Sequence, residues 1–310
     1  MAAQVVVSAA LAAEPGGRLA NAGSDPLAAL PSFVAQPAGG TEALDQHDLY
    51  GHYDLSTMSH HVSSVAWLTG GVYASTLAFG VLDWDWGTAS FSLADEGFFG
   101  RNTDHGGTDK IGHAFSTYLL SDFFTFAIRR RAANPHGAAL TGAVLGMGVM
   151  TMVEVLDGFS SHGLSWEDLV VDAAGAAFSY LRNTVPGLRD KVDFRVEYLP
   201  SGNTDWYRPH ADYMGQKYLL AFKLAGFDQL EHTPLRFVEL HAGYYARGFH
   251  REDKIAGESR RREPFVGIGL NLQELLFSQP SVRDTAAGRI GRFTLEYVQV
   301  PYTRISQPYD

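Results

Sequence analysis

The distribution of hydrophobic residues divides the chain into a helical part and a strand part. Residues 62–82 carry no charged side chain, and about 20 such residues are enough for a helix to cross a bilayer core. Apolar residues recur at helical spacing over 109–131, residues 137–153 are again uncharged, and Ser165 can begin a helix that ends near Arg182. The pattern predicts a bundle of about four apolar helices.

After Pro186 the spacing changes from helical to alternating. In VDFRVEYL, Phe194 and Val196 alternate with Arg195 and Glu197, as in a strand with two unlike faces. Further strands are predicted at 216–224, 235–245, 265–275 and 293–300. The fold class is therefore α+β, with an N-terminal bundle of about four apolar helices followed by an antiparallel β-meander of about five strands. Because five strands are too few to close a transmembrane barrel, we expect the sheet to pack on the bundle or lie on a membrane.

The chain is expected to have three regions. Residues 1–59 combine a signal-like segment with a linker: an apolar run from Val5 to Ala13 is not preceded by a basic residue, and 14–45 are rich in proline and glycine. An alanine-rich tail is the alternative to a signal. Residues 60–186 form the helical, membrane-associated bundle, and residues 187–310 form the antiparallel sheet region.

Composition narrows the class of protein. Hydrophobic residues make up 45% of the chain and charged residues 19%, below the roughly 25% typical of soluble domains. This composition favours either extra buried surface or contact with lipid. The net charge of −10 argues against a nucleic-acid partner. These 310 residues contain no cysteine, so they form no disulfide, thiolate metal site or lipidated cysteine. A membrane lipid or another envelope component is the expected partner.

The candidate chemistry lies on the helices, where ionisable residues occur at spacings of three and four. If the helices pack together, their side chains could hold a divalent metal ion. Alternatively, His113 and a desolvated Glu154 could act as a general acid and base, with Asp109 as the third candidate catalytic residue. The candidate metal ligands are Asp109, His113, Glu154 and Asp172. The remaining polar cluster is Asp157, Ser160, Asp168 and Asp172.

Each candidate also has a structural interpretation. Asp109 can stabilise the first turn of its helix, and His113 can be a hydrogen-bonded core histidine. Asp168 can complete a capping box with Ser165. Glu154 is the hardest to explain in this way, because a long uncharged segment precedes it and an unpaired buried carboxylate is costly. A structural hydrogen-bond network remains the main alternative to catalysis.

The loop GFSSHGLS is similarly open to two interpretations. Asp157 and Gly158 form a dipeptide that is common in turns. His162 can reach the helical site or remain in a solvated loop.

The segments DKIGHAFSTYLLSD and GAVLGMGVMTMVEVLDGFSSHGLSWEDLVVDAAGA resemble the YfiM-like predicted periplasmic lipoproteins, a bacterial family described as domain of unknown function 2279. The resemblance extends over about residues 60–275, through DYMGQKYLLAFKL, and the helical part is more distantly similar to VanZ-like membrane proteins. The family pattern falls on Asp109, Lys110, Gly112, His113, Glu154, Asp157, Gly158, Phe159, Ser160, Ser165, Asp168, Asp172 and Gly175.

Two departures from the family pattern stand out. The lipoprotein description implies a lipidated cysteine, which these residues lack. Asp172 stands where relatives are expected to have asparagine, and its extra negative charge favours a bound cation or proton.

The resemblance implies a location in the bacterial cell envelope, either membrane-associated on the periplasmic side or at the outer membrane, and it implies no reaction. The first hypothesis is a membrane-associated structural or binding module with a buried Asp/His/Glu cluster. The alternative is an envelope hydrolase that acts on a lipid or glycan headgroup through His/Glu acid–base chemistry or a divalent metal.

Overall fold

The computed structural model describes residues 53–100, 103, 105–202, 209–249, 255, 257 and 259–307. The signal-like run and most of the linker predicted for residues 1–59 lie outside these described residues. The chain divides into two compact units. The helical unit contains the described residues up to Ala94 together with Ser116–Leu164 and Asp172–Tyr180. The sheet unit contains Asp95–Phe115, Ser165–Val171 and the residues from Leu181 onward.

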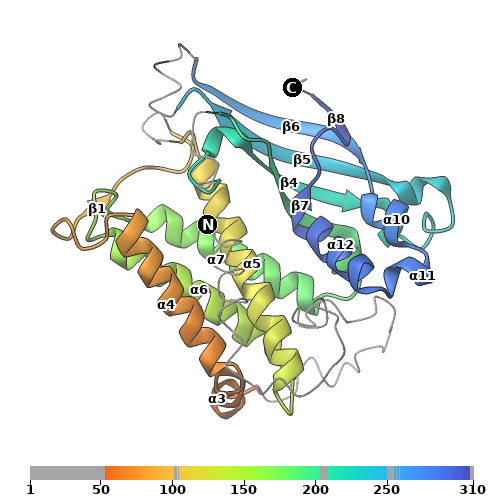
Figure 1. Ribbon diagram of the computed structural model, residues 1–310, viewed down its shortest axis with the longest axis horizontal. Coiled ribbons are helices and arrows are strands. Elements are labelled where there is room, and N and C mark those ends of the chain that lie inside the picture. The colour runs from red at the N-terminus through yellow and green to blue at the C-terminus, as the bar shows by residue number, and fades with distance from the viewer. Residues whose placement is uncertain are drawn as a thin grey trace, which may run out of the picture. The chain divides into compact units, whose positions relative to one another are not determined.

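Long helices dominate the first part of the described chain (Figure 1). The predicted helices at 109–131, 137–153 and 165–182 are confirmed to within a few residues, because their apolar spacing and end signals are local properties. The helices are α3 (Leu55–Ser64), α4 (Ala66–Asp83), α5 (Thr108–Arg131), α6 (Ala138–Asp157) and α7 (Trp166–Thr184).

The helix predicted over residues 62–82 is confirmed from Ala66 onward as α4, but residues 62–64 belong to the separate helix α3. The chain breaks at Val65, where φ is −121° and ψ is 14°, and the axes of α3 and α4 meet at a bend of 71°. The hydroxyls of Ser63 and Ser64 donate to the backbone carbonyls of Ser59 and His61 at 2.8 and 2.7 Å. Such local hydrogen bonds compete with the helical backbone pattern.

Glycines on α6 allow α5 to approach closely. A Cβ on Gly142 would lie 2.2 Å from Thr125 Oγ1 and 2.7 Å from the Ser121 carbonyl oxygen. A Cβ on Gly146 would lie 2.8 Å from the Ser121 backbone nitrogen. Small residues at a spacing of four thus form the face of α6 that packs against α5.

The sheet unit contains a six-stranded sheet with the order β7-β3-β4-β5-β6-β8 (Figure 1). The strands β3 to β6 are antiparallel neighbours in chain order, which confirms this part of the meander. β8 extends the sheet beside β6, and β7 pairs with β3 in parallel. The strands are β3 (Val192–Tyr198), β4 (Gln216–Lys223), β5 (Val238–Arg247), β6 (Arg261–Leu270), β7 (Val298–Gln299) and β8 (Arg304–Gln307).

The remaining elements are shorter. β1 (Leu93–Ala94) and β2 (Leu164–Ser165) form a separate two-stranded ladder. The short helices are α8 (Leu188–Lys191), α10 (Leu272–Phe277), α11 (Pro280–Arg283) and α12 (Ala286–Tyr297), with 3₁₀ turns η1 (Tyr213–Gly215), η2 (Leu224–Gly226) and η3 (Pro234–Phe237).

The strand predicted at 293–300 is wrong for most of its length, because residues up to Tyr297 belong to α12. Phe293 and Tyr297 satisfy both an alternating and a helical spacing, and in the folded chain their rings contact each other one helical turn apart, with centroids at 5.1 Å. Thr285 begins the helix by accepting a hydrogen bond from the Gly288 amide. The strand predicted at 265–275 similarly ends at Leu270, and Asn271 caps α10.

The sheet buries its charged face and exposes apolar side chains on the opposite face, which is the reverse of the usual arrangement in water. The charged face predicted from Arg195 and Glu197 exists, but it is buried. The opposite face exposes a cross-strand row, Phe222, Leu240, Ile268 and Ile305, which the register aligns and of which Ile305 is 74% exposed. An antiparallel sheet in water usually exposes its polar side, so an apolar environment would stabilise this face.

Candidate functional site

The first turn of α5 buries a lysine among carboxylates. Lys110 has no solvent exposure. Its Nζ donates to Asp168 Oδ2 at 2.8 Å, lies 3.3 Å from Asp109 Oδ2 and forms a further ion pair with Glu96. Glu96 comes from the loop before α5 and Asp168 from the first turn of α7. These four residues, which we call the Lys110 cluster, all belong to the sheet unit.

Negative charge exceeds positive charge in the Lys110 cluster, because three carboxylates face one ammonium. Burial raises the pKa of Glu96, although the contact with Lys110 opposes this shift. Asp109 Oδ1 and Asp168 Oδ1 are buried and have no hydrogen-bond partner among the described residues. The cluster therefore has acceptor oxygens left for a further hydrogen-bond donor.

Asp168 lies in the first turn of α7 and also forms the ion pair with Lys110. Its backbone amide donates to Ser165 Oγ at 3.2 Å, so the predicted N-cap of α7 is confirmed. The adjacent Glu167 is also buried, and its Oε1 accepts a 3.0 Å hydrogen bond from the Gly97 amide. The first turn of α7 thus fixes the loop that supplies Glu96.

Gly112 allows a tyrosine of β4 to lie against α5. A Cβ at this position would lie 3.0 Å from the Tyr218 hydroxyl, which donates to Gln216 Oε1 at 2.7 Å. Burial raises the pKa of Tyr218, so its phenol remains a donor. The rings of Phe115 and Tyr218 are also in contact, with centroids at 5.6 Å. The glycine between Lys110 and His113 therefore has a packing role.

Three of the predicted ligands form a group. One ligand atom from each of His113, Glu154 and Asp172 lies within 4.8 Å of the other two, and α5, α6 and α7 each supply one residue. Glu154 and Asp172 are buried, and Thr117 donates to Asp172 Oδ1 at 2.7 Å. An imidazole and two carboxylates suit a divalent transition-metal ion. Without an ion, the same groups can exchange a proton.

The other predicted site residues lie elsewhere. Asp109 belongs to the Lys110 cluster. Asp157 Oδ1 accepts a 2.6 Å hydrogen bond from the indole of Trp86, and Ser160 Oγ donates to the Asp157 carbonyl at 2.9 Å. His162 Nδ1 lies 3.1 Å from Ser160 Oγ. The turn after α6 thus uses Asp157 and Ser160 to fix its own conformation, as the turn interpretation predicted.

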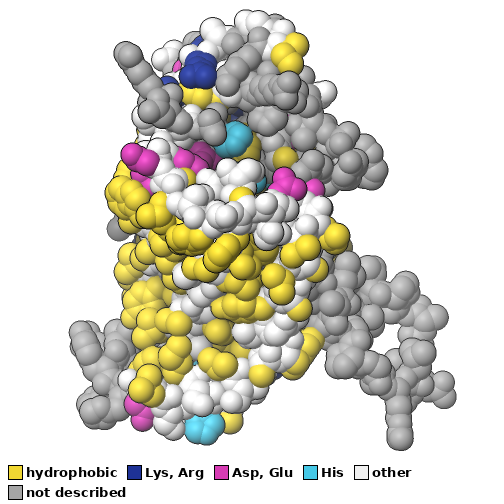
Figure 2. All heavy atoms as spheres, turned by 90° about the vertical axis from the view of Figure 1, so that its left-hand side faces the viewer, with side chains coloured by type: hydrophobic (Ala, Val, Ile, Leu, Met, Phe, Trp, Pro, Cys, Tyr) yellow, Lys and Arg dark blue, Asp and Glu magenta, His cyan; other side chains and the backbone are white. Residues whose placement is uncertain are grey.

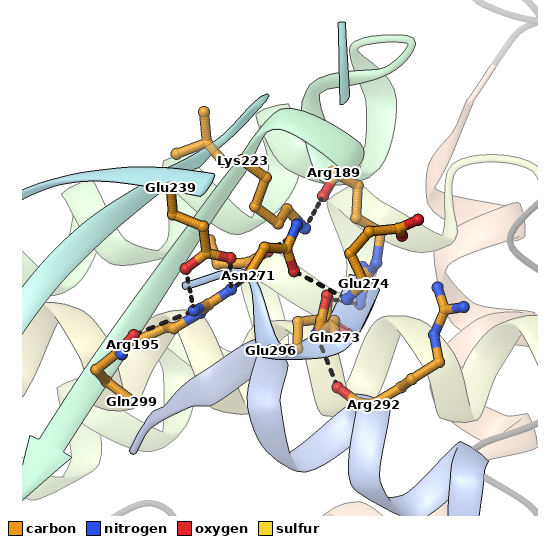
Figure 3. Close-up of polar contacts among 12 residues, drawn as sticks. Arg189, Arg195, Lys223, Glu239, Asn271, Gln273, Glu274, Arg292, Glu296 and Gln299 are labelled. Atoms are coloured by element: carbon orange, nitrogen blue, oxygen red, sulfur yellow. Dashed lines mark hydrogen bonds and ion pairs between the residues drawn. The ribbon is translucent and has the colours of Figure 1, made fainter. Parts of the chain in front are cut away.

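A second buried polar group, which we call the sheet network, lies on the charged face of the sheet (Figure 3). Arg195 binds both carboxylate oxygens of Glu239 at 2.7 and 2.9 Å and donates to Gln299 at 3.1 Å. Lys223 donates to the Arg189 carbonyl at 2.9 Å. Figure 3 shows these side chains converging from β3, β4 and β5, beside the residues that α10 and α12 contribute.

Asp193 is the central anion of the sheet network. It forms ion pairs with Lys223 at 2.8 Å and with Arg195 and Arg182 at 2.5 Å. Burial alone would raise the pKa of Asp193, but these three cations outweigh that effect and hold the pKa below its ordinary value. Because the charges are mutually paired, the network is suited to holding the sheet together.

Sequence reasoning missed several of these residues. Glu96 and Glu167 were not predicted, and Lys110 was not placed among the site residues. Glu96 lies in the loop ADEGFFG, where no periodicity marks it. The alternation in VDFRVEYL did reveal a charged face, but not that this face is buried.

Residues 95–184 match the model of a family described as predicted periplasmic lipoprotein (DUF2279). The match contains the whole Lys110 cluster together with His113, Glu154 and Asp172, and it is shorter than the resemblance expected over about residues 60–275. No curated protein and no solved structure matches the chain significantly.

Proposed function

We propose that the chain is an envelope protein whose helical unit is embedded in a membrane as a structural or binding module, and the match of residues 95–184 to a family described as predicted periplasmic lipoprotein supports the envelope location. The main support for this proposal is that the outer sides of α4 and α6 are uncharged. All their exposed side chains are apolar, including Trp67, Leu77 and Val81 on α4 and Val144 and Val155 on α6. A helix that faces water usually carries charges on that side.

The distribution of hydrophobic side chains on the surface supports this proposal. Figure 2 shows them over a broad band, with charged and histidine side chains at the two ends of the band. α6 has 20 residues, which correspond to about 30 Å, and it is apolar enough to cross a bilayer. α3 and α4 satisfy the same length and hydropathy criterion only as a bent pair. The uncharged sheet face around Ile268 offers a second apolar surface.

Membrane fractionation tests the proposal. The full chain, expressed in a Gram-negative host, is expected to sediment with membranes, to remain there in high salt and to require detergent for release, because apolar attachment is not screened. Recovery of the chain in the soluble fraction without detergent would contradict the proposal.

A substitution separates a lipid-facing surface from a water-facing one. Ala74 is exposed near the middle of α4. Ala74→Arg is expected to impair insertion, because a central arginine costs about 2.5–3.5 kcal/mol in a membrane helix. On a surface that faces water the same change would alter stability by only about 0.5 kcal/mol. The matched control is Ser90→Arg in the exposed loop after α4, which should leave fractionation unchanged.

The grouping of His113, Glu154 and Asp172 favours a second candidate function, hydrolysis of a lipid or glycan headgroup with a divalent metal or a His/Glu pair. An ion at this group would polarise a scissile bond and activate water. Chain purified without chelators and resupplied with metal should then contain one ion per chain. Glu154→Gln should lose that ion while keeping the unfolding transition. Absence of stoichiometric metal would exclude the metal-dependent form of this function.

A further inference from the structure

The ends of the helical unit differ in charge. α5 ends in Arg129, Arg130 and Arg131, which we call the basic end. The Arg131 guanidinium lies 5.5 Å above the ring of Trp67, the second residue of α4. The opposite ends of α4 and α6 carry the acidic residues Asp83 and Asp157, and we call this the acidic end.

Contacts at both ends show that α4 and α6 run in the same direction. At the basic end, the His61 ring bonds Thr141 of α6 and the carbonyl of Asn134, each at 2.8 Å. At the acidic end, Trp86 donates to Asp157 at the end of α6. α4 contains 18 residues and α6 contains 20, or about 27–30 Å, which matches the thickness of a bilayer core. The charged residues of the two helices, Asp83, Glu154 and Asp157, all lie in the last turn.

Aromatic side chains occur at both the basic end and the acidic end. Trp67 and Tyr53 lie at the basic end, where the Tyr53 hydroxyl bonds Thr141 at 2.6 Å. Trp84 and Trp86 contact each other at the acidic end, with ring centroids 5.3 Å apart. Tryptophan and tyrosine are enriched where a transmembrane protein meets the headgroup layers, and arginine is enriched on the cytoplasmic side.

From this charge asymmetry we infer that the helical unit crosses the cytoplasmic membrane in one orientation, with the basic end bound to anionic lipid headgroups of the inner leaflet. The acidic end then faces the periplasm. This inference rests on the proposed membrane insertion and adds to it a lipid partner and a direction. Guanidinium groups bind phosphate oxygens, and the inner leaflet attracts basic residues close to a membrane segment.

The absence of cysteine allows a direct test by single-cysteine labelling. Ala133→Cys reports on the exposed loop after the basic end, and Ser90→Cys reports on the exposed loop after α4. In cells with an intact cytoplasmic membrane, a maleimide that cannot cross this membrane should label Ser90→Cys. It should label Ala133→Cys only after permeabilisation. The reverse pattern overturns the inferred direction.

Fractionation of the same samples separates the inference from the proposed function. If both positions react in intact cells and the chain is soluble, membrane insertion itself is wrong. If both react and the chain remains with membranes, only the single orientation is wrong.

Replacing the three arginines tests whether the basic end binds anionic lipid headgroups. The orientation preference is the ratio of chains with the basic end in the cytoplasm to chains with it in the periplasm. In the Ala133→Cys background, changing Arg129, Arg130 and Arg131 to glutamine should lower this ratio by on the order of 100-fold. Changing the same three residues to lysine should retain it. The charge-matched control replaces Arg283, Arg289 and Arg292 of the sheet unit with glutamine and should change nothing. Equal labelling of the glutamine and lysine variants would overturn the role of the basic end.

Discussion

Replacement of Lys110 by methionine tests whether the Lys110 cluster is structural. The change retains much of the aliphatic chain and removes the charge that neutralises Asp168 and Asp109, whose nearest oxygens lie 2.8 and 3.3 Å from Nζ, as well as the pairing with Glu96. Removal of one partner from a buried ion pair costs about 3–5 kcal/mol, because the remaining charge is buried without compensation. We expect Lys110→Met to lower the free energy of unfolding by about 4 kcal/mol.

Denaturant unfolding in mild detergent, followed by tryptophan fluorescence, measures this loss. Lys110→Met combined with Asp168→Asn should recover part of it, because removing one carboxylate reduces the repulsion, and coupling energies between contacting residues are about 0.5–3 kcal/mol. The control is Arg283→Gln, which breaks the exposed pair with Asp284 and should cost less than about 1 kcal/mol. If Lys110→Met is as stable as the control, the lysine is not required for stability.

Two further predictions concern packing and pH. Gly142→Ala should lower the free energy of unfolding by about 1–3 kcal/mol, because its Cβ would overlap α5, whereas Gly70→Ala should raise it by about 0.5–1 kcal/mol, because nothing lies within 4 Å of that Cβ. Equal effects in the same unfolding assay would contradict the close approach of the helices. Asp193→Asn should cost about 3–5 kcal/mol at pH 7. Since the folded-state pKa of Asp193 lies below its ordinary 3.8, the stabilisation is complete above that pH and is lost as pH falls through the folded-state pKa. The difference between the native chain and Asp193→Asn should therefore shrink in acid, and a constant difference between pH 7 and pH 2 would contradict this reasoning.

The sequence alone was sufficient wherever the deciding interaction is local. The helices α5, α6 and α7 follow from apolar spacing, and the N-cap of α7 follows from Ser165. The alternation that makes β3 a strand was also recognisable from the spacing of apolar and charged residues. Each of these features depends on residues within a few positions of one another, so a short window contains the physical cause.

Where distant residues compete or pair, only the tertiary structure decides the outcome. The spacing of Phe293 and Tyr297 fits a strand or a helix, and the folded chain selects the helix. Glu96 joins Lys110 and Asp168 because a loop and two helices converge, which no sequence period records. The alternation in β3 reveals one charged face, but burial of that face depends on the cations and helices that cover it. Desolvation and charge pairing are properties of the folded surroundings, and these determine whether a carboxylate is a solvated side chain or a candidate site residue.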